Sequence, residues 1–219
     1  MRPAAVVFDN DGLLLDTEDA WTRAETVLFE RHGGTFTMEH KRDMIGSSHA
    51  VAAGKLERML GLPGEGFALM AELHDLVMEE ALREVAPRPG AEALVAALRD
   101  AGIPVAVASN SPRDFLDRVL AGSGMAGRFA VTVAGDEVEH PKPAPDVYLA
   151  ACRALGADPA ASVALEDSPT GAAAAKAAGM TVIGVPYLPD MEIPPADLVA
   201  GSLADALVRE ACGLLPSFS

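Results

Sequence analysis

Five short apolar runs, each followed by a helical pattern, constrain the fold of this 219-residue chain more than any other feature. The runs are apolar nearly throughout, as expected for strands that helices cover on both faces of a parallel sheet. This alternation of strand and helix predicts an α/β fold with a doubly wound parallel sheet. One further short helix is expected within Gly201–Ser219. The expected strands are Ala4–Phe8, Ile103–Ser109, Phe129–Ala134, Ser162–Glu166 and Thr181–Val185.

The stretch from Glu18 to Arg88 departs from this alternation, because it contains helical patterns with no strand between them. We therefore expect a small all-helical cap domain at residues 18–88, inserted after the first strand of an α/β core at residues 1–17 and 89–219. Such a cap would cover the carboxyl end of the first strand, where ligands bind in open α/β sheets. The expected cap helices are Asp19–His32, Met38–Ile45, His49–Leu60 and Phe67–Glu84.

The charge balance limits the classes of partner, since 17 basic and 32 acidic residues give a net charge of −15. A pI near 4.6 excludes a general affinity for nucleic acid or for anionic membranes, whose phosphates repel such a chain. No apolar run approaches the roughly 18–20 residues that span a bilayer, and Asp9 and Asp11 interrupt the first apolar segment, so no signal peptide is expected. Cys152 and Cys212 are too few for a disulfide framework. We expect a cytoplasmic monomer that binds a small ligand.

Polar and charged residues follow four of the expected strands. Because the carboxyl ends of parallel strands meet at one edge of the sheet, we expect these side chains to lie close together. Paired carboxylates at such a place require a compensating charge, and a hard divalent cation prefers oxygen ligands of this kind. Hydroxyl and amide donors at a helix N-terminus suit a phosphate. The residues are Asp9 and Asp11, Ser109 and Asn110, Lys142, and Glu166 and Asp167.

Each of these positions also has an ordinary structural explanation. The sequence Asn10-Asp11-Gly12 is typical of a turn, and Lys142 suits an exposed loop. Ser111-Pro112 and Ser168-Pro169 each combine an N-cap residue with a proline at the first helical position. The coincidence of acids, anion-binding donors and a cation at four strand ends favours one functional site over four separate structural roles.

Together these residues resemble the four ordered motifs of the haloacid dehalogenase superfamily, as Asp9-x-Asp11-Gly12, Ser109-Asn110, Lys142-Pro143 and Glu166-Asp167-Ser168. The helical segment after the first motif is similar to the cap of the β-phosphoglucomutase and phosphoglycolate phosphatase-like branch. The resemblance spans residues 3–190, and the ordered set of motifs is specific whereas any single motif is not. It implies a Rossmann-like core with an inserted helical cap.

The resemblance also implies roles for the motif residues. Asp9 would be the nucleophile that forms an aspartyl-phosphate, and Asp11 would be the general acid that protonates the leaving alcohol and then the base that activates water. Mg²⁺ would be held by Asp9, the main-chain carbonyl of Asp11 and Asp167, with Glu166 binding directly or through water. The phosphoryl oxygens would be bound by Ser109, Asn110 and Lys142.

The second aspartate decides among relatives, because cleavage of a carbon–halogen bond needs no leaving-group protonation and relatives with that activity lack it. The favoured function is a Mg²⁺-dependent phosphatase for a small phosphorylated metabolite, such as a sugar phosphate or a phosphoglycolate-like monoester. One alternative is a β-phosphoglucomutase-type phosphomutase. Another is a phospho-aspartate signalling module, although such modules are about half as long and lack the helical insertion.

Substrate specificity is expected to depend on the cap, at Trp21, Ile45 and His49. Aligned with the mutases, Trp21 stands where they carry a phosphotransfer histidine, and His49 stands where they carry a substrate-binding arginine. Both replacements favour hydrolysis over return of the phosphoryl group to a sugar, and Trp21 also suits plain packing beneath the cap. The identity of the substrate stays open.

Overall fold

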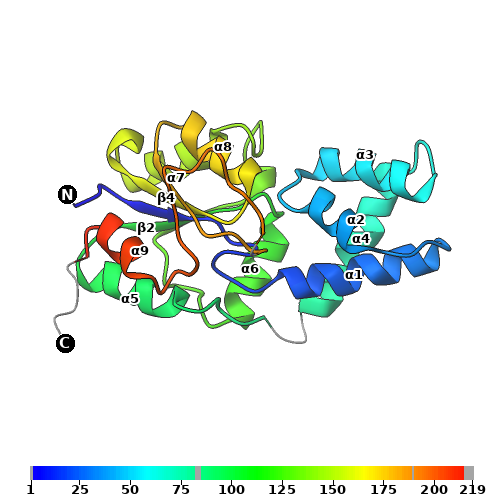
Figure 1. Ribbon diagram of the computed structural model, residues 1–219, viewed down its shortest axis with the longest axis horizontal. Helices are drawn as coiled ribbons and strands as arrows, with labels where there is room; N and C mark the ends of the chain where they lie inside the picture. The colour runs from blue at the N-terminus through cyan, green and yellow to red at the C-terminus, as the bar shows by residue number, and fades with distance from the viewer. Residues whose placement is uncertain (1, 82–84, 189, 215–219) are drawn as a thin grey trace.

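The computed structural model of the protein describes residues 2–81, 85–188 and 190–214 (Figure 1). Six parallel strands form one sheet in the order β3-β2-β1-β4-β5-β6. The chain builds the sheet outward from β1 in both directions, so β1 lies at the switch point where ligands bind in open α/β sheets. The strands are β1 (Val6–Phe8), β2 (Val105–Ala108), β3 (Val131–Val133), β4 (Val163–Glu166), β5 (Thr181–Gly184) and β6 (Leu198–Val199).

Helices cover both faces of the sheet, which explains why the central strands are apolar nearly throughout. Val6 and Phe8 of β1 belong to one hydrophobic cluster with residues of α5, α6 and α9, whereas Val7 belongs to a second cluster with residues of α7 and α8. Figure 1 shows α7 and α8 on one side of the sheet and α5 and α9 on the other. The predicted doubly wound sheet is thus confirmed. These helices are α5 (Ala91–Asp100), α6 (Arg113–Gly122), α7 (Asp146–Leu155), α8 (Pro169–Ala177) and α9 (Ala206–Ala211), with short 3₁₀ turns η1 (Gly135–Glu137) and η2 (Pro159–Ala161).

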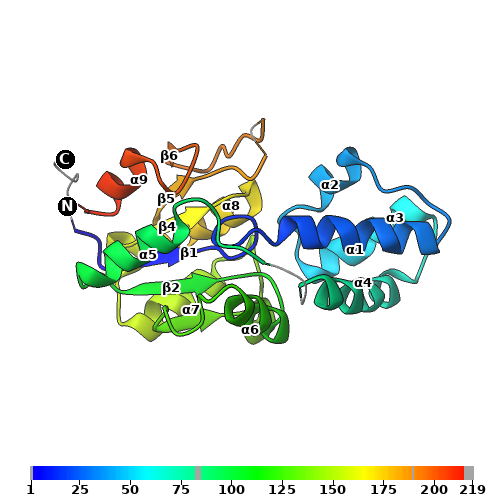
Figure 2. The same ribbon diagram turned by 90° about the horizontal axis from the view of Figure 1, so that it is seen from below.

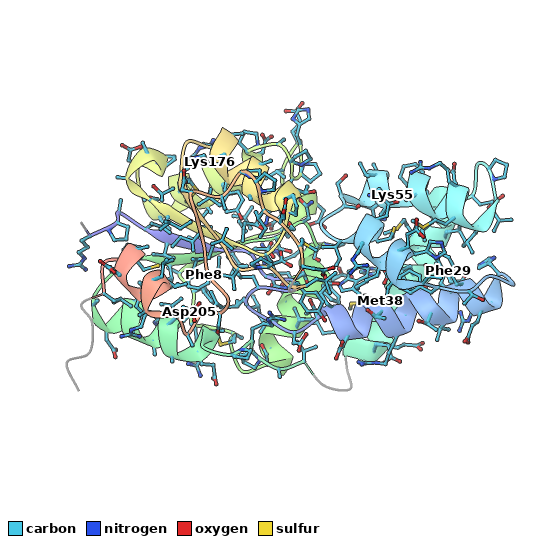
Figure 3. All side chains as sticks on the ribbon, viewed as in Figure 1. Phe8, Phe29, Met38, Lys55, Lys176 and Asp205 are labelled. Carbon is cyan, nitrogen blue, oxygen red and sulfur yellow. The ribbon has the colours of Figure 1, made fainter. Side chains whose placement is uncertain are left out.

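Four helices follow β1 without an intervening strand and form the cap, which lies to one side of the sheet (Figures 1 and 2). They share a hydrophobic interior that includes Phe29, Leu56 and Leu73. Figure 3 shows Phe29 among these helices and Phe8 in the sheet domain. Positions 82–84 of the last expected cap helix lie outside the described residues, and the domain limits drawn from the sequence stay a prediction. The cap helices are α1 (Glu18–Arg31), α2 (Met38–Met44), α3 (His49–Leu60) and α4 (Gly66–Ala81).

The chain crosses between core and cap twice, and the two crossings lie side by side. The Asp16 N–H donates to the Ala86 carbonyl at 2.8 Å, and the Arg88 N–H donates to the Leu14 carbonyl at 2.9 Å. An antiparallel bridge joins Leu15 to Pro87 between them. Both connections to the cap therefore leave the core at one place, just beyond the carboxyl end of β1.

Two details differ from the sequence-based expectations. Strand β6 was not expected, because its two residues are exposed and lack an apolar run; it is held by pairing with β5. Ser111 does not cap α6, since Pro112 occupies the N-cap position and no side chain caps that end. Ser168, by contrast, accepts a hydrogen bond from the Gly171 N–H as predicted.

The expected tail helix corresponds to α9, and positions 215–219 of that segment lie outside the described residues. Across the described ranges, none of the helices combines the length and apolar character that crossing a membrane requires.

Candidate active site

The carboxyl end of β1 lies between the ends of β2 and β4. Phe8 is in register with Val107 of β2 and with Leu165 of β4. The Asp9 N–H continues this ladder by donating to the Leu165 carbonyl at 3.0 Å. Because the strands are parallel and in register, the residues that follow them, Asp9 and Ser109, come to the same edge as Glu166.

Lys142 joins two of the carboxylates at this edge. Its Nζ lies 2.5 Å from Asp9 Oδ1 and 2.6 Å from Glu166 Oε1, and all three residues are buried. Burial lowers the pKa of Lys142, but attraction to Asp9 and Glu166 outweighs burial and raises it above the ordinary lysine value. Lys142 is therefore a fixed positive charge, as its place between two prolines suggests.

Asp11 has a different set of partners, although it lies only two residues from Asp9. Its Oδ1 accepts from the Thr17 hydroxyl at 2.8 Å, and its Oδ2 accepts from the hydroxyls of Ser109 at 3.0 Å and Ser111 at 2.8 Å. Ser109 Oγ also accepts from the Ser111 N–H at 2.9 Å. The Asp11 carboxylate is thus held by three neutral hydroxyls, whereas Asp9 is held by an ammonium.

Gly12 allows the backbone to turn sharply between Asp11 and the rest of the site. Its φ of 82° is in the left-handed region, and a Cβ at this position would lie 2.3 Å from Asp167 Oδ2. Only glycine fits both the conformation and the close approach. The turn thereby lets Asp167 reach the end of β1.

The Asn110 side chain fixes the loop that carries Lys142. Its Oδ1 accepts from the Lys142 N–H at 2.8 Å, and its Nδ2 donates to the Lys142 carbonyl at 3.2 Å. The amide therefore pairs with both main-chain polar groups of one residue. In this arrangement the side chain of Asn110 positions the lysine.

Asp9, Glu166 and Asp167 form a cluster that fits a divalent metal ion. Each offers a carboxylate oxygen, and these atoms all lie within 4.8 Å of one another. Burial raises the pKa of Asp9 and of Asp167 well above the ordinary aspartate value, and neighbouring carboxylates raise both further. Asp167 Oδ2 is buried and has no hydrogen-bond partner among the described residues. A hard cation such as Mg²⁺ would compensate the negative charge of these carboxylates and give Asp167 Oδ2 a partner. The residues therefore fit the ion.

One cavity of about 120 Å³ connects this edge of the sheet with the cap. The predicted cap residues Trp21, Ile45 and His49 line it, as do the core residues Asp9, Asp11, Asn110, Lys142 and Asp167. Ser109 and Glu166 do not line the cavity and are completely buried behind it.

Trp21 has both roles that the sequence allowed. It lines the cavity, and its ring centroid lies 5.5 Å from that of Phe115 on α6, so it also packs against the core. His49 is exposed and stacks on Phe67 with ring centroids 5.9 Å apart. His49 therefore lies at the mouth of the cavity, on the cap side.

A family model of haloacid dehalogenase-like hydrolases matches residues 3–179, which is most of the chain. The protein belongs to the haloacid dehalogenase-like hydrolase family. This membership makes the chain an enzyme and favours hydrolysis over the signalling alternative.

Several relatives of this haloacid dehalogenase-like hydrolase match along most of its length. It is 31% identical to hexitol phosphatase B of Escherichia coli over 223 residues, covering 95% of this chain and 96% of that one. It is 36% identical to (DL)-glycerol-3-phosphatase 1 of Arabidopsis thaliana over 225 residues, covering 97% and 74%. The crystal structure of CbbY from Rhodobacter sphaeroides in complex with phosphate superimposes with a TM-score of 0.80 at 30% identity, covering 93% and 96%. The β-phosphoglucomutase of Clostridium difficile, at 20% identity and a TM-score of 0.80, shares the fold.

Three polar groups near this edge of the sheet were not predicted as site residues, although Ser111 was predicted as a helix cap. Tyr148 of α7 donates its hydroxyl to Glu166, and its ring centroid lies 4.9 Å from Lys142 Nζ. Thr17 and Ser111 both donate to Asp11. Ser111 follows the Ser109-Asn110 motif directly and could have been found from that spacing; Tyr148 and Thr17 carry no local signal.

The cap contributes three charged residues to the same cavity, and the sequence did not predict these residues as part of the site. Glu18 and Glu25 of α1 and Lys41 of α2 line the cavity and are buried. Glu18 and Glu25 are two helical turns apart on one face of the expected helix, which is the one sequence signal available. Their meeting with Lys41 depends on how α2 packs against α1.

Proposed function

We propose that this hydrolase is a Mg²⁺-dependent phosphatase that hydrolyses a small phosphorylated metabolite through an aspartyl-phosphate. The observation that carries the proposal is the contrast between two aspartates bordering one cavity. Asp9 is buried against Lys142, and Asp11 accepts hydrogen bonds from three hydroxyls. A nucleophile and a general acid–base require such separate environments. Relatives named for phosphatase activity on hexitol and glycerol phosphates support this reading.

In the first half of the reaction, a carboxylate oxygen of Asp9 attacks the phosphorus atom of the substrate. The bond between phosphorus and the ester oxygen breaks, and the electron pair leaves with that oxygen. Asp11, in its protonated form, gives its proton to the departing oxygen, so the product leaves as a neutral alcohol. Asp9 now carries the phosphoryl group, and Asp11 is ionised.

In the second half, water attacks the phosphorus atom of the aspartyl-phosphate. Asp11 takes a proton from this water, and the bond between phosphorus and the Asp9 oxygen breaks. Inorganic phosphate leaves, and both aspartates return to their starting states. The hydroxyls of Thr17, Ser109 and Ser111 hold Asp11 in place for both proton transfers.

Lys142 binds and neutralises the phosphoryl oxygens during both steps, assisted by the segment at Asn110. Ser109, predicted to bind these oxygens, lies behind the cavity and donates to Asp11, so it acts on the reaction through that carboxyl. Two hydrogen bonds from the Asn110 side chain keep Lys142 in position. Electrostatic stabilisation of this kind supplies most of the catalysis in phosphoryl transfer, because the transition state spreads negative charge over the phosphoryl oxygens.

Asp9, Asp167 and the main-chain carbonyl of Asp11 would hold Mg²⁺. Glu166 would act through water, since it lies behind the cavity and contacts Lys142 and Tyr148. When bound, the ion offsets the charge of the carboxylates and of the phosphoryl group. Asp167 Oδ2, which is buried and finds no hydrogen-bond partner in the described part of the chain, is the ligand atom that the ion would satisfy most directly.

A phosphomutase of the β-phosphoglucomutase type is the alternative, and the cap argues against it. A mutase must hold the aspartyl-phosphate and exclude water while its substrate turns around. Trp21 provides an apolar wall against Phe115, and His49 is exposed at the cavity mouth. Neither residue supplies the arrangement by which the mutases are expected to retain a sugar. The proposal includes action as a monomer in the cytoplasm, for which gel filtration and fractionation are the measurements.

The decisive experiment is ³¹P NMR of β-glucose 1-phosphate with Mg²⁺ and a trace of the 1,6-bisphosphate, alongside a panel of small phosphate monoesters. We expect net release of inorganic phosphate from the panel and little formation of glucose 6-phosphate. Asp9→Asn should reduce hydrolysis by several orders of magnitude, whereas Asp100→Asn, at an exposed position, should not. Rapid isomerisation with negligible free phosphate would establish the mutase instead.

A further inference from the structure

The cap side of the cavity carries a compact group of charges, Glu18, Glu25 and Lys41, called here the cap triad. Lys41 Nζ lies 2.5 Å from Glu18 Oε2 and 3.5 Å from Glu25 Oε2. It also donates to the Glu18 main-chain carbonyl at 3.2 Å. The three residues are 7%, 3% and 3% exposed, respectively. Charges buried to this degree in a substrate cavity act strongly on whatever enters it, because little water screens them.

The hydrogen bonds of the cap triad leave acceptors available and no donors. An ammonium has three N–H groups, and those of Lys41 face three oxygens of the triad itself. A carboxylate has about four acceptor sites, so Glu18 and Glu25 keep lone pairs free after pairing with Lys41. The triad therefore presents hydrogen-bond acceptors to the cavity, which match the hydroxyl groups of a ligand.

The charge of the cap triad also favours an uncharged ligand group over an anionic one. Two carboxylates face one ammonium, and burial raises the pKa of Glu25 to about 7 despite the nearby Lys41. The net charge is thus −1 above that pH and close to zero below it, and it is positive in neither case. A ligand group that carries a full negative charge, such as a carboxylate or a second phosphate, would meet repulsion there.

The other basic residues lining the cavity are already paired or lie at its mouth. Lys142, at the core end, contacts Asp9 and Glu166 and is assigned to the reacting phosphoryl group. His74 pairs with Asp114 at 3.1 Å, and His49 is exposed at the mouth. Among the described residues that line the cavity, no lysine is therefore left to bind a second anion.

We propose that the cap triad selects substrates whose leaving group is a small, uncharged alcohol bearing further hydroxyls, and rejects those with a second anionic group. The inference rests on the proposed phosphatase function and deepens it, because it names the class of phosphate monoester. Glu18 and Glu25 accept hydrogen bonds from the hydroxyls of the leaving group. The cavity of about 120 Å³ suits a polyol or sugar fragment of a few carbons.

The test compares two phosphate monoesters of similar size at pH 8 with Mg²⁺. Glycerol 3-phosphate carries free hydroxyls, and 2-phosphoglycolate carries a carboxylate. The measured quantity is the ratio of their kcat/KM values, because a general loss of activity cancels in a ratio. We expect the ratio to favour glycerol 3-phosphate by at least about tenfold. A ratio near one, or one that favours 2-phosphoglycolate, overturns the inference.

Two variants assign the preference to the cap triad. Glu25→Gln keeps the shape of the side chain and leaves Lys41 with one carboxylate, so the ratio should fall about tenfold, mainly through a lower KM for 2-phosphoglycolate. Glu18→Gln should act in the same direction. Glu30→Gln removes the same charge from an exposed position of the same helix and should leave the ratio unchanged. An unchanged ratio in both triad variants overturns the assignment.

Failure of the inference and failure of the proposed function give different results. Turnover of p-nitrophenyl phosphate with the wrong preference between the two esters overturns the inference alone. Absence of turnover for every ester overturns the phosphatase, and binding then decides the inference. In that case the rise in melting temperature produced by each ester with Mg²⁺ is compared. A larger rise with glycerol 3-phosphate supports the selection, and a larger rise with 2-phosphoglycolate overturns it.

Discussion

Asp9 and Asp11 carry the same carboxyl group two residues apart, and at the residue scale their neighbours distinguish them. Asp9 is pressed against the Lys142 ammonium in a buried cluster, where burial raises the pKa of the carboxyl. Asp11 is partly exposed and held by hydroxyls, which can hold a protonated or an ionised carboxyl by turning their O–H bonds. The proposed division of labour between nucleophile and acid–base follows from these partners.

We expect Asp11→Asn to impair the release of a poor leaving group far more than that of a good one. An alkyl phosphate should lose about 10²–10⁴-fold in its first step, because general acid catalysis contributes that much. With p-nitrophenyl phosphate the first burst of nitrophenol should persist while later turnover slows, since the intermediate still lacks its base. Rapid-quench and stopped-flow kinetics measure both. Equal loss of the burst for the two substrates would contradict a role in leaving-group protonation.

Gly12→Ala and Gly33→Ala form a matched pair at left-handed glycines. Both have positive φ, so both should lose about 1–2 kcal/mol of unfolding free energy. A Cβ on Gly33 meets nothing within 4 Å, whereas one on Gly12 would collide with Asp167 Oδ2. Only Gly12→Ala should therefore also lose Mg²⁺ binding and activity. Calorimetric titration with Mg²⁺ checks this, and similar Mg²⁺ affinities in the two variants would contradict it.

Residues of the site could be predicted where their role depends on position along the chain. Asp9 and Ser109 come directly after buried strands and Glu166 is the last residue of one, and an apolar pattern locates such strands well. Tyr148 could not be found in this way, because its contact with Glu166 requires α7 to pack across the sheet. Nor could the sequence tell that Asn110 pairs with the main chain of Lys142, since two loops must first meet.

At the scale of elements, Lys41 ties α2 to α1 through the carboxylates of Glu18 and Glu25. We expect Lys41→Met to lower the unfolding free energy by about 3–5 kcal/mol, because it leaves two buried carboxylates without a counter-charge. Lys176→Met removes a lysine whose ion pair with Asp197 is exposed, and should cost under about 1 kcal/mol. Urea denaturation of both variants measures the difference. Equally small losses of unfolding free energy in the two variants would show that the ion pairs of Lys41 contribute little to stability.

Glu25 makes the stability of the α1–α2 pair depend on pH. Burial raises the pKa of Glu25 from 4.5 in the unfolded chain to about 7 in the folded protein. At pH values between these two, the protein therefore takes up a proton when it folds. The contribution of Glu25 is fully present below pH 4.5 and is lost as the pH rises through about 7. The unfolding free energy of Glu25→Gln should therefore rise relative to that of the parent by about 2.5 kcal/mol as the pH increases from 5 to 8. Denaturation at both pH values, with Glu30→Gln as control, tests this; a difference that does not change with pH would contradict it.

The helices and strands that bury many apolar side chains could be predicted from the sequence, and those that bury few could not. The central strands and the helices of the cap have patterns that only burial explains, and their ends differ from expectation by a few residues. Strand β6 has two exposed residues and is defined by its backbone pairing with β5. A pattern of apolar and polar side chains cannot predict such a pairing. The prediction that Ser111 caps a helix is wrong because a serine before proline can either accept from the N–H groups of a helix N-terminus or donate to a carboxylate. Here the Ser111 hydroxyl donates to Asp11 and does not cap α6.

At the scale of the whole molecule, metal binding should connect the chemistry with stability. Mg²⁺ should raise the melting temperature, because an ion that binds the folded state stabilises it by mass action. EDTA should abolish both that rise and activity, and Ca²⁺ should restore the rise better than the activity, since its looser coordination disturbs the geometry of transfer. Asp167→Asn should lose the response, and Asp100→Asn should keep it. Full activity after rigorous chelation would contradict the metal site.

The two crossings between core and cap have a consequence for how such a protein changes over time. They leave the core side by side, joined by hydrogen bonds from Asp16 to Ala86 and from Arg88 to Leu14. The whole cap is therefore inserted into the core as a single long connection whose two ends are adjacent and hydrogen-bonded to each other. A different insert can replace it without rerouting a strand or moving Asp9, Lys142 or Asp167. We therefore expect that the cap, the part proposed to choose the substrate, can be exchanged while the chemistry proposed for the core is retained.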